Sequence, residues 1–198
     1  MNAFDTTLYH AINNLSGHWI WFDDIMKFIA QYALEVYAVL FILFWFILPR
    51  SKPASRHALV TAFFAGVLAL VINFIIAHFI WNRNRPFVSF GQGHFHQLIP
   101  HAADASFPSD HTSGSFGFAA GTWGSNKLVS WSFTIFAILV MFSRVYTGVH
   151  WPTDVLASVV VGILSGWIMK KCSKLLLPIT RFGMKLFRLE PKKASHRL

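Results

Sequence analysis

The stretch ALVTAFFAGVLALVINFIIAHFIW, which occupies residues 58–81, decides the fold of this chain. It holds no Asp, Glu, Lys or Arg, and it ends directly before the basic, proline-containing NRNRP. A helix needs about 20 consecutive apolar residues to cross roughly 30 Å of hydrocarbon. The stretch is long enough to do so, and it therefore predicts a membrane-spanning helix.

Other apolar runs flank this stretch on both sides. They are Leu34–Leu48, which extends backward to about Phe22, Leu128–Phe142 and Val155–Met169. A further helix is expected to begin near Pro108, where the small residues of SGSFGFAAGTWG allow helices to approach closely within a bilayer. We therefore predict five spans.

The chain as a whole has the composition of a membrane protein. It is 55% hydrophobic and only 13% charged, which is too apolar for an ordinary soluble domain. The predicted fold is an all-α polytopic membrane helical bundle. It would comprise an interfacial segment at 1–21, a membrane-embedded domain at 22–170, and a basic tail with an interfacial helix at 171–198. A sixth span within residues 4–20 is the alternative.

The formal charge of +9 indicates membrane topology rather than a nucleic-acid partner, because it gathers at the C-terminus and in one short loop. The cytoplasmic side of a membrane protein carries the excess of Lys and Arg. One side would hold Arg50, Lys52, Arg56, Lys127 and the nine Lys and Arg residues from Lys170 to Arg197, and the other only Lys27, Arg83, Arg85 and Arg144. This imbalance predicts a cytoplasmic C-terminus, with residues 82–108 and 143–154 on the outer side.

The predicted outer segments contain residues suited to hold a phosphate group. Arg85 and Arg144 offer planar pairs of donors that match phosphate oxygens, although Arg144 taken alone could equally snorkel to lipid headgroups. Ser109 is placed to cap the helix that begins near Pro108, and Pro152 suits the first turn of the last span. Both helix N-termini would point their free amides at one outer pocket, which binds an anion without a metal.

Two histidines in such a pocket can divide the chemistry of phosphate transfer. Imidazole can act as nucleophile, base or acid near neutral pH. His150 is the expected nucleophile, because Asp154 follows it by four residues and could hold one ring nitrogen while the other attacks phosphorus. His111 would protonate the leaving oxygen.

These residues resemble the type 2 phosphatidic acid phosphatase superfamily, whose signature has three parts. The third part (Ser-Arg, five residues, His, three residues, Asp) is matched fully by Ser143, Arg144, His150 and Asp154. The second part (Pro-Ser-Gly-His) is PSDH here, with Asp110 in the glycine position. The first part (Lys, six residues, Arg-Pro) ends in Arg85 and Pro86 but has His78 in the lysine position. The resemblance covers about residues 20–170.

The two departures from the signature both concern phosphate binding. Asp110 still supplies a backbone amide, but its carboxylate would repel phosphate unless it points away or bonds a neighbour. Protonated His78 could replace the lysine, Arg83 could supply the missing cation, or one donor is absent. Asn73, within the second span, is expected to form an interhelical hydrogen bond.

The resemblance implies a bundle of the vanadium haloperoxidase-like class and a phosphohistidine mechanism without metal or other cofactor. In that mechanism His150 attacks, His111 donates a proton and Asp154 supports His150. The phosphate oxygens would be held by Arg85, Ser109, the Asp110 amide, Arg144 and His78. The wording LIPHAADASFPSDH is also similar to the bacterial undecaprenyl pyrophosphate phosphatases of the bacitracin-resistance type. It implies a bacterial plasma-membrane enzyme that forms undecaprenyl phosphate and favours bacitracin resistance, with membrane lipids and no nucleic acid as partners.

Two other functions stay open at this point. The same chemistry could act on another lipid phosphate, such as phosphatidylglycerol phosphate, phosphatidate or diacylglycerol pyrophosphate. Alternatively, the chain could be an anion or lipid transporter, which would explain the arginines and the spans. Transport does not explain an oriented pair of His150 and Asp154 beside His111, and the chain lacks the paired interrupted helices typical of inverted repeats.

A metal centre is the weaker interpretation of the remaining histidines. His94, His96 and His101 share one loop but lack the ligand spacing of a rigid site. Cys172 is the single cysteine, so neither an intrachain disulfide nor a cysteine zinc cluster can form.

Overall fold

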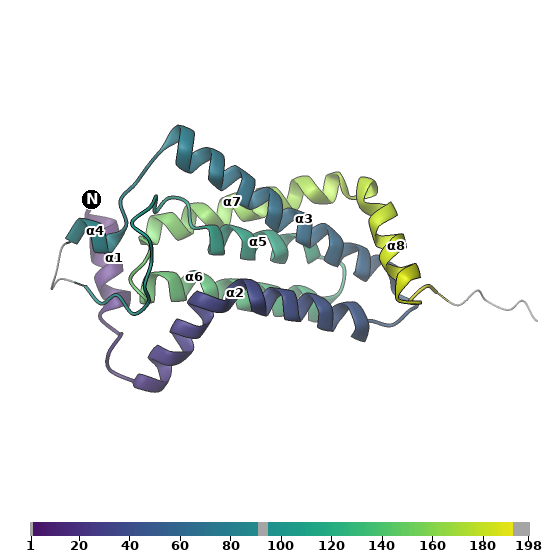
Figure 1. The fold of residues 1–198 in the computed structure, drawn as a ribbon, viewed down its shortest axis with the longest axis horizontal. Coiled ribbons are helices and arrows are strands. Elements are labelled where there is room, and N and C mark those ends of the chain that lie inside the picture. Colours follow the sequence, from purple (N-terminus) through teal and green to yellow (C-terminus); the bar gives the residue numbers. More distant parts are fainter. Residues whose placement is uncertain (1, 91–94, 192–198) are drawn as a thin grey trace, which may run out of the picture.

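The computed structural model describes residues 2–90 and 95–191 as a bundle of helices (Figure 1). The elements are α1 (Ala3–Asn13), α2 (Ile20–Ile47), α3 (Pro53–Ile75), the π-helical turn η1 (Ile76–Ile80), α4 (Pro86–Phe90), α5 (Asp110–Thr122), α6 (Lys127–Tyr146), α7 (Pro152–Lys171), the 3-10 turn η2 (Ser173–Leu176) and α8 (Leu177–Leu186). The all-α prediction is confirmed.

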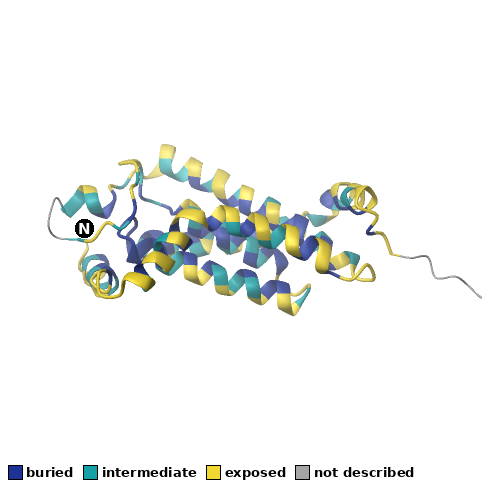
Figure 2. Cartoon of the chain, turned by 60° about the horizontal axis from the view of Figure 1, so that its bottom comes forward, coloured by how far each residue is buried: buried dark blue, intermediate teal, exposed yellow. Residues whose placement is uncertain are grey.

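Four of these helices are long and apolar enough to cross a membrane. They are α2, α3 continued through η1, α6 and α7, with 20 to 28 residues each. Their outward faces carry exposed large apolar residues such as Leu34, Val39 and Val160, while buried positions face the bundle interior (Figure 2). Exposed apolar surface on this scale marks contact with lipid in a chain of this composition. The protein is a membrane protein, as predicted.

Helix α5 differs from the predicted third span because it has only 13 residues. At about 1.5 Å rise per residue it is too short to cross the hydrocarbon alone. It lies centrally among α3, α6 and α7 (Figure 1). An added Cβ at Gly121 would lie 2.5 Å from the Ala62 Cα, and one at Gly166 would lie 2.4 Å from the Ala120 Cβ. The small residues thus allow close contact, and the N-terminus of α5 starts inside the bundle.

Helix α1 and the segment before α5 close one end of the bundle. The buried Asn13 amide donates to the backbone oxygens of Tyr146 (2.9 Å) and His96 (2.7 Å), which joins α1, the 95–109 segment and the end of α6. With 11 residues α1 cannot be a sixth span, so that alternative is wrong. Its interfacial location remains a prediction.

Helix α8 lies across the opposite end of the bundle (Figure 1). Arg56 is fully buried there and donates to the backbone oxygens of Trp45 (2.9 Å), Pro49 (3.0 Å) and Leu48. These carbonyls lie at and just beyond the C-terminus of α2, where helical partners are lacking. Arg56 therefore holds the start of α3 to the end of α2. This connection lies at the α8 end of the bundle, opposite to α1.

Candidate active site

A polar cavity of about 720 Å³ opens at the α1 end of the bundle. Its lining comes from the end of α3 and η1, the segments before α4 and α5, the start of α5, the end of α6 and the turn before α7. Its polar lining residues are Asn73, His78, Asn82, Arg85, His101, Asp104, Asp110, His111, Arg144 and His150. Six of the eight predicted site residues therefore surround one space, and the other two, Ser109 and Asp154, lie behind it.

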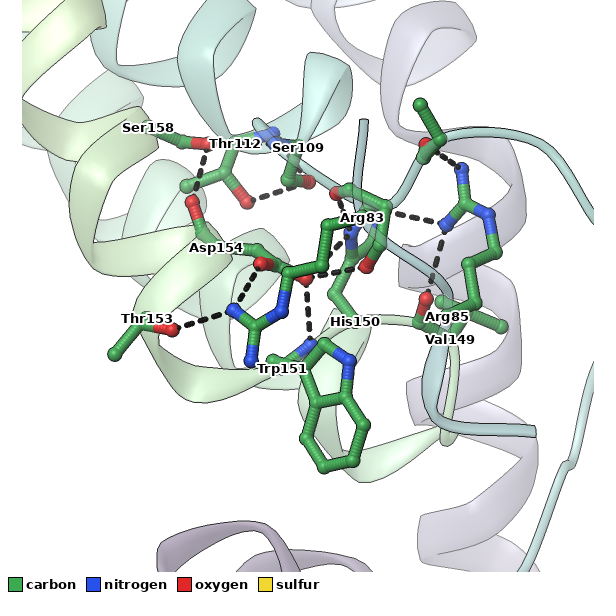
Figure 3. A network of polar contacts seen from close by, with 12 residues as sticks. Arg83, Arg85, Ser109, Thr112, Val149, His150, Trp151, Thr153, Asp154 and Ser158 are labelled. Atoms are coloured by element: carbon green, nitrogen blue, oxygen red, sulfur yellow. Dashed lines mark hydrogen bonds and ion pairs between the residues drawn. The ribbon is translucent and has the colours of Figure 1, made fainter. Parts of the chain in front are cut away.

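His150 presents one ring nitrogen to the cavity and fixes the other on the backbone. It is 2% exposed, and its Nδ1 lies 2.8 Å from the carbonyl oxygen of Ser106. A ring nitrogen facing a carbonyl carries the proton, so the lone pair of neutral His150 is on Nε2. Arg85 Nη1 lies 3.1 Å from that Nε2 (Figure 3). The arrangement prepares Nε2 as a nucleophile that Arg85 covers in the absence of substrate.

Asp154 supports His150 differently from the predicted direct bond. Its Oδ2 is 3.7 Å from His150 Nδ1, whereas it accepts hydrogen bonds from the Ser106 hydroxyl and from the Trp151 amide at 2.9 Å (Figure 3). The sequence argument assumed helical spacing, but His150 precedes Trp151, the N-cap of α7, and so lies outside the helix. Asp154 therefore acts on His150 mainly through Ser106, which holds the ring through its carbonyl.

The pKa of His150 lies well below its ordinary value because burial disfavours the imidazolium and the cations Arg144 and Arg85 lie close. His150 is therefore neutral at neutral pH, as a nucleophile must be. We expect the acid limb of kcat/KM to lie below pH 6.5.

Replacing Arg85 by glutamine removes a nearby positive charge, which stabilises the imidazolium and raises the pKa of His150. The acid limb of Arg85→Gln should therefore move to higher pH than that of the parent. The measurement is kcat/KM of the variant divided by kcat/KM of the parent, from pH 4 to 8. This ratio cancels the titration of the substrate itself and should fall as the pH is lowered. A ratio that does not fall as the pH is lowered would contradict this electrostatic assignment.

Arg144 holds unused hydrogen-bond donors beside His150. It is 1% exposed, and its Nη1 donates to the Ala30 backbone oxygen at 2.7 Å. Within residues 2–90 and 95–191, no acceptor lies within bonding distance of its Nε or Nη2. A buried donor without a partner costs about 1–3 kcal/mol, and more when it is charged. The geometry suits an anion whose oxygens would satisfy both atoms.

Arg85, by contrast, is bonded on every nitrogen. Its Nε donates to Asp104 Oδ1 (2.8 Å), and its Nη2 donates to the Ala105 backbone oxygen (3.1 Å). Its Nη1 donates to the Val149 backbone oxygen (2.9 Å) and faces His150 (Figure 3). These contacts hold the guanidinium at the cavity wall, where a phosphate could displace the contact with His150.

The start of α5 places Ser109, Asp110 and His111 in different roles. Ser109 is fully buried and caps the helix, accepting bonds from the Thr112 amide (3.5 Å) and hydroxyl (3.1 Å). Ser109 does not line the cavity, so a contact of its hydroxyl with phosphate stays a prediction. His111 lines the cavity and also an adjoining apolar groove.

The carboxylate of Asp110 bonds a neighbour, which was one condition for tolerating it. Its Oδ1 accepts a hydrogen bond from Asn73 Nδ2 at 2.9 Å, and Asn73 Oδ1 accepts one from the Ser113 hydroxyl at 3.1 Å. Asn73 is thus the expected interhelical partner. The backbone amide of Asp110, at the first position of α5, has no helical acceptor and remains suited to an anion.

His78 and Arg83 were the two candidates to supply the cation of the lysine in the first part of the signature, and they lie in different places. His78 is exposed at the cavity edge, where its Nδ1 lies 2.9 Å from the Phe74 backbone oxygen and its ring stacks on Phe74. Arg83 is bonded to Asp5 and Asp154 and does not line the cavity. The alternative in which Arg83 supplies the missing cation is therefore wrong, whereas His78 keeps one nitrogen available.

Sequence reasoning missed Asp104 and Ser106, and it considered His101 only as a metal ligand. Asp104 and Ser106 precede the second motif, and only their contacts reveal that they hold Arg85 and His150. His101 faces His150 with its ring centroid 6.2 Å away, and burial, followed by the cations Arg85 and Arg144, lowers its pKa. A histidine so close to the second motif was the available signal.

The three histidines weighed as metal ligands do not share one environment. His96 bonds Ser16 and the Asn13 side chain away from the cavity, and His101 lines the cavity. His94 lies outside the described residues. Across the described part of the chain, no group of three His, Cys, Asp or Glu residues is placed to hold a metal.

Comparison with known proteins places this site in a family. The chain is 38% identical over 180 residues to undecaprenyl-diphosphatase BcrC of Bacillus subtilis, covering 91% of this chain and 90% of that protein. It is 31% identical to the putative undecaprenyl-diphosphatase YbjG of Escherichia coli, covering 83% and 80%. Among solved structures, LpxE of Aquifex aeolicus has a TM-score of 0.66 at 27% identity, covering 86% of this chain and 96% of that chain.

A second solved structure shares the fold at lower identity. It is the transmembrane PAP2 type phosphatidylglycerolphosphate phosphatase of Bacillus subtilis, with a TM-score of 0.61 at 20% identity, covering 88% of this chain and 89% of that chain. Residues 58–177 match the PAP2 superfamily, a range that contains every predicted site residue. The chain belongs to the PAP2 superfamily.

Proposed function

We propose that this protein hydrolyses undecaprenyl pyrophosphate to undecaprenyl phosphate and phosphate, by way of a phosphohistidine at His150. The observation that carries the proposal is one cavity that joins the Nε2 lone pair of His150 to the unused donors of Arg144. The names of the curated relatives supply the lipid. Regeneration of this cell-wall lipid carrier would favour bacitracin resistance.

In the first step, His150 Nε2 forms a bond to the terminal phosphorus while the bond from phosphorus to the bridging oxygen breaks. Arg85 turns from Nε2 to the phosphate oxygens, which Arg144 and the Asp110 amide also bind. Before substrate binds, burial and then the Arg144 charge lower the pKa of His111 to about 3, so the proton that His111 donates arrives with the anionic pyrophosphate. His111 gives this proton to the departing oxygen, which leaves with undecaprenyl phosphate. The Ser106 carbonyl keeps the proton on His150 Nδ1 and stabilises the positive charge that develops on the ring.

In the second step, water attacks the phosphorus and the bond to His150 Nε2 breaks. His111, now neutral, takes a proton from that water, and inorganic phosphate leaves the cavity. Both histidines return to their starting protonation states. The site thus completes one turnover with residues of this chain alone.

A lipid substrate is supported by the apolar groove that adjoins the phosphate cavity. The groove lies among α2, α3 and α5, and its lining includes Leu34, Tyr37, Phe63 and Phe118. It shares Asp110 and His111 with the cavity. A lipid whose phosphate lies beside His150 could therefore place its hydrocarbon chain in this apolar groove.

The orientation of the site follows from the distribution of charge. The cavity lies at the α1 end, whereas the excess of Lys and Arg lies toward the α8 end, which the positive-inside rule assigns to the cytoplasm. We therefore propose a bacterial plasma-membrane enzyme whose site faces the extracytoplasmic side. Residues 1–21 and 171–198 would be interfacial segments that flank the phosphatase domain at 22–170.

The purified protein should release phosphate from undecaprenyl pyrophosphate in excess chelator. The test compares this lipid with phosphatidylglycerol phosphate, phosphatidate and diacylglycerol pyrophosphate in the same detergent. The highest kcat/KM on the polyprenyl pyrophosphate supports the proposal. Turnover of phosphatidylglycerol phosphate without turnover of the polyprenyl lipid would overturn the substrate assignment, and proteoliposomes that transport without releasing phosphate would indicate the transporter.

A further inference from the structure

A buried network of charges connects the N-terminal helix to the catalytic histidine. The Arg83 guanidinium lies between two carboxylates, with Nη2 2.6 Å from Asp5 Oδ2 and Nη1 2.8 Å from Asp154 Oδ1. Both carboxylate side chains are fully buried, and Arg83 is 15% exposed. The guanidinium also lies over the Trp151 ring, 5.2 Å from its centroid. Three charges thus form one compact group behind the cavity, of which Figure 3 shows Arg83 and Asp154.

Arg83 is linked to His150 indirectly, through Ser106 and Asp154. Its backbone oxygen accepts a hydrogen bond from the Ser106 amide at 2.7 Å, and Ser106 in turn accepts the bond from His150 Nδ1. Its side chain holds Asp154, whose other oxygen accepts the Ser106 hydroxyl. A change at Arg83 therefore reaches His150 by two routes.

Asp5, in α1, also binds Thr153 at the start of α7. Its Oδ1 accepts the Thr153 amide at 2.9 Å, and its Oδ2 accepts the Thr153 hydroxyl at 2.7 Å. Thr153 is in the first turn of α7, where a carboxylate is favoured by the helix dipole. Burial raises the pKa of Asp5, but the bonds from Arg83 and Thr153 outweigh burial and leave the pKa below its ordinary value. Asp5 is therefore charged at neutral pH.

We propose that Asp5 is a positioning residue for catalysis, which offsets the charge of Arg83 so that Asp154 remains able to stabilise positive charge on His150. With Asp5 present, the two carboxylates and one guanidinium carry a net charge of −1. Without it, Arg83 would neutralise Asp154, and the imidazolium character that develops during attack would lose its counter-charge. The inference rests on the proposed function, because it assumes that His150 is the nucleophile.

The predicted readout is the basicity of His150. The charged and titratable groups that surround this ring are Arg85, His101, Asp104, His111, Arg144 and Asp154. None of them is substituted in Asp5→Asn, and asparagine keeps an oxygen that can accept the Thr153 amide. Loss of a nearby negative charge disfavours the imidazolium, so the acid limb of kcat/KM should move to lower pH. A less basic nucleophile is also slower.

The experiment measures kcat, KM, pH profile and melting temperature of purified Asp5→Asn with undecaprenyl pyrophosphate. We expect kcat to fall about 10- to 100-fold, with KM within about twofold of the parent. This range is typical of residues that orient an active-site side chain by hydrogen bonding, as measured for the partners of metal ligands. Asn13→Ala is the matched control, because it loosens the other end of α1 without changing charge. It should lower the melting temperature and leave the acid limb unmoved.

Two further variants keep the test decisive if Asp5→Asn folds poorly. Arg83→Gln leaves two buried carboxylates, so its acid limb should move to higher pH. The double variant Asp5→Asn/Arg83→Gln restores the net charge of −1 and removes an ion pair as a unit, which proteins tolerate better than loss of one partner. Its acid limb should return to that of the parent.

The outcomes separate this inference from the proposed function. If Asp5→Asn lowers only the melting temperature, with the parental kcat and acid limb, Asp5 merely anchors α1 and the inference is wrong. If all three variants share one acid limb, the charge argument is also wrong. If His150→Ala remains active on the same lipid, the proposed function itself fails.

Discussion

His150→Ala is expected to reduce phosphate release from undecaprenyl pyrophosphate by roughly 10⁴-fold or more, the scale typical of losing a covalent nucleophile. Alanine removes the ring nitrogen that lies 3.1 Å from Arg85 Nη1, in the cavity that Arg144 also lines. Binding should largely survive, because both arginines remain. The measurement is steady-state phosphate release, together with the affinity of the inactive variant for the lipid.

The matched control for this substitution is His18→Ala. His18 is exposed between α1 and α2, away from the cavity. This variant should retain parental kcat/KM. Equal activity of parent and His150→Ala would remove His150 from the mechanism, whereas equal loss in both variants would indicate a general effect of substitution at this end of the bundle.

Arg144→Met is expected to lower kcat/KM about 10²- to 10³-fold, comparable to removing a donor that stabilises charge in a transition state. Its Nε and Nη2 are the donors that phosphate oxygens would satisfy. Arg144→Lys should recover only part of the loss, because an ammonium cannot reproduce the planar pair of donors. The free protein should lose little stability, because loss of the one bond from Nη1 to the Ala30 oxygen is offset by removal of a buried cation with two unused donors.

Arg56→Met provides the opposite pattern. Arg56 is also fully buried, but it donates to three backbone oxygens. Its loss should lower the free energy of unfolding by about 2 kcal/mol or more, because those oxygens lose their partner, while the folded fraction keeps its kcat/KM. If Arg144→Met destabilises the protein as much as Arg56→Met and retains activity, Arg144 is structural.

The bundle and the centre of the site could be predicted from local sequence. Apolar runs set the long spans, because helix length must match the hydrocarbon thickness. The grouping of Arg85, His111, Arg144 and His150 followed from placing three polar segments on one side of the membrane. Alternation of spans makes this possible, since every second connection lies on the same side.

The remaining features depend on contacts between distant residues. Asp5 and Arg83 are 78 positions apart, and neither motif nor periodicity connects them. Asp154 was expected to bond the His150 ring, but α7 begins only at Pro152. Asp154 therefore bonds the Trp151 amide at the start of the helix, and the Ser106 carbonyl bonds the ring instead. Helix α5 begins near Pro108 as predicted, but its 13 residues are too few for the predicted span.

The most direct test of the account is to trap the covalent intermediate. His111→Gln, mixed with undecaprenyl pyrophosphate labelled in the terminal phosphate and quenched with alkali within one turnover, should carry label on the peptide that contains His150. The variant should accumulate label because loss of His111 slows attack by water more than it slows the first step, in which undecaprenyl phosphate is a good leaving group. A bond that is stable in alkali and lost in acid is predicted for phosphohistidine. Phosphate release without any protein-bound label, or label at another residue, would contradict the account.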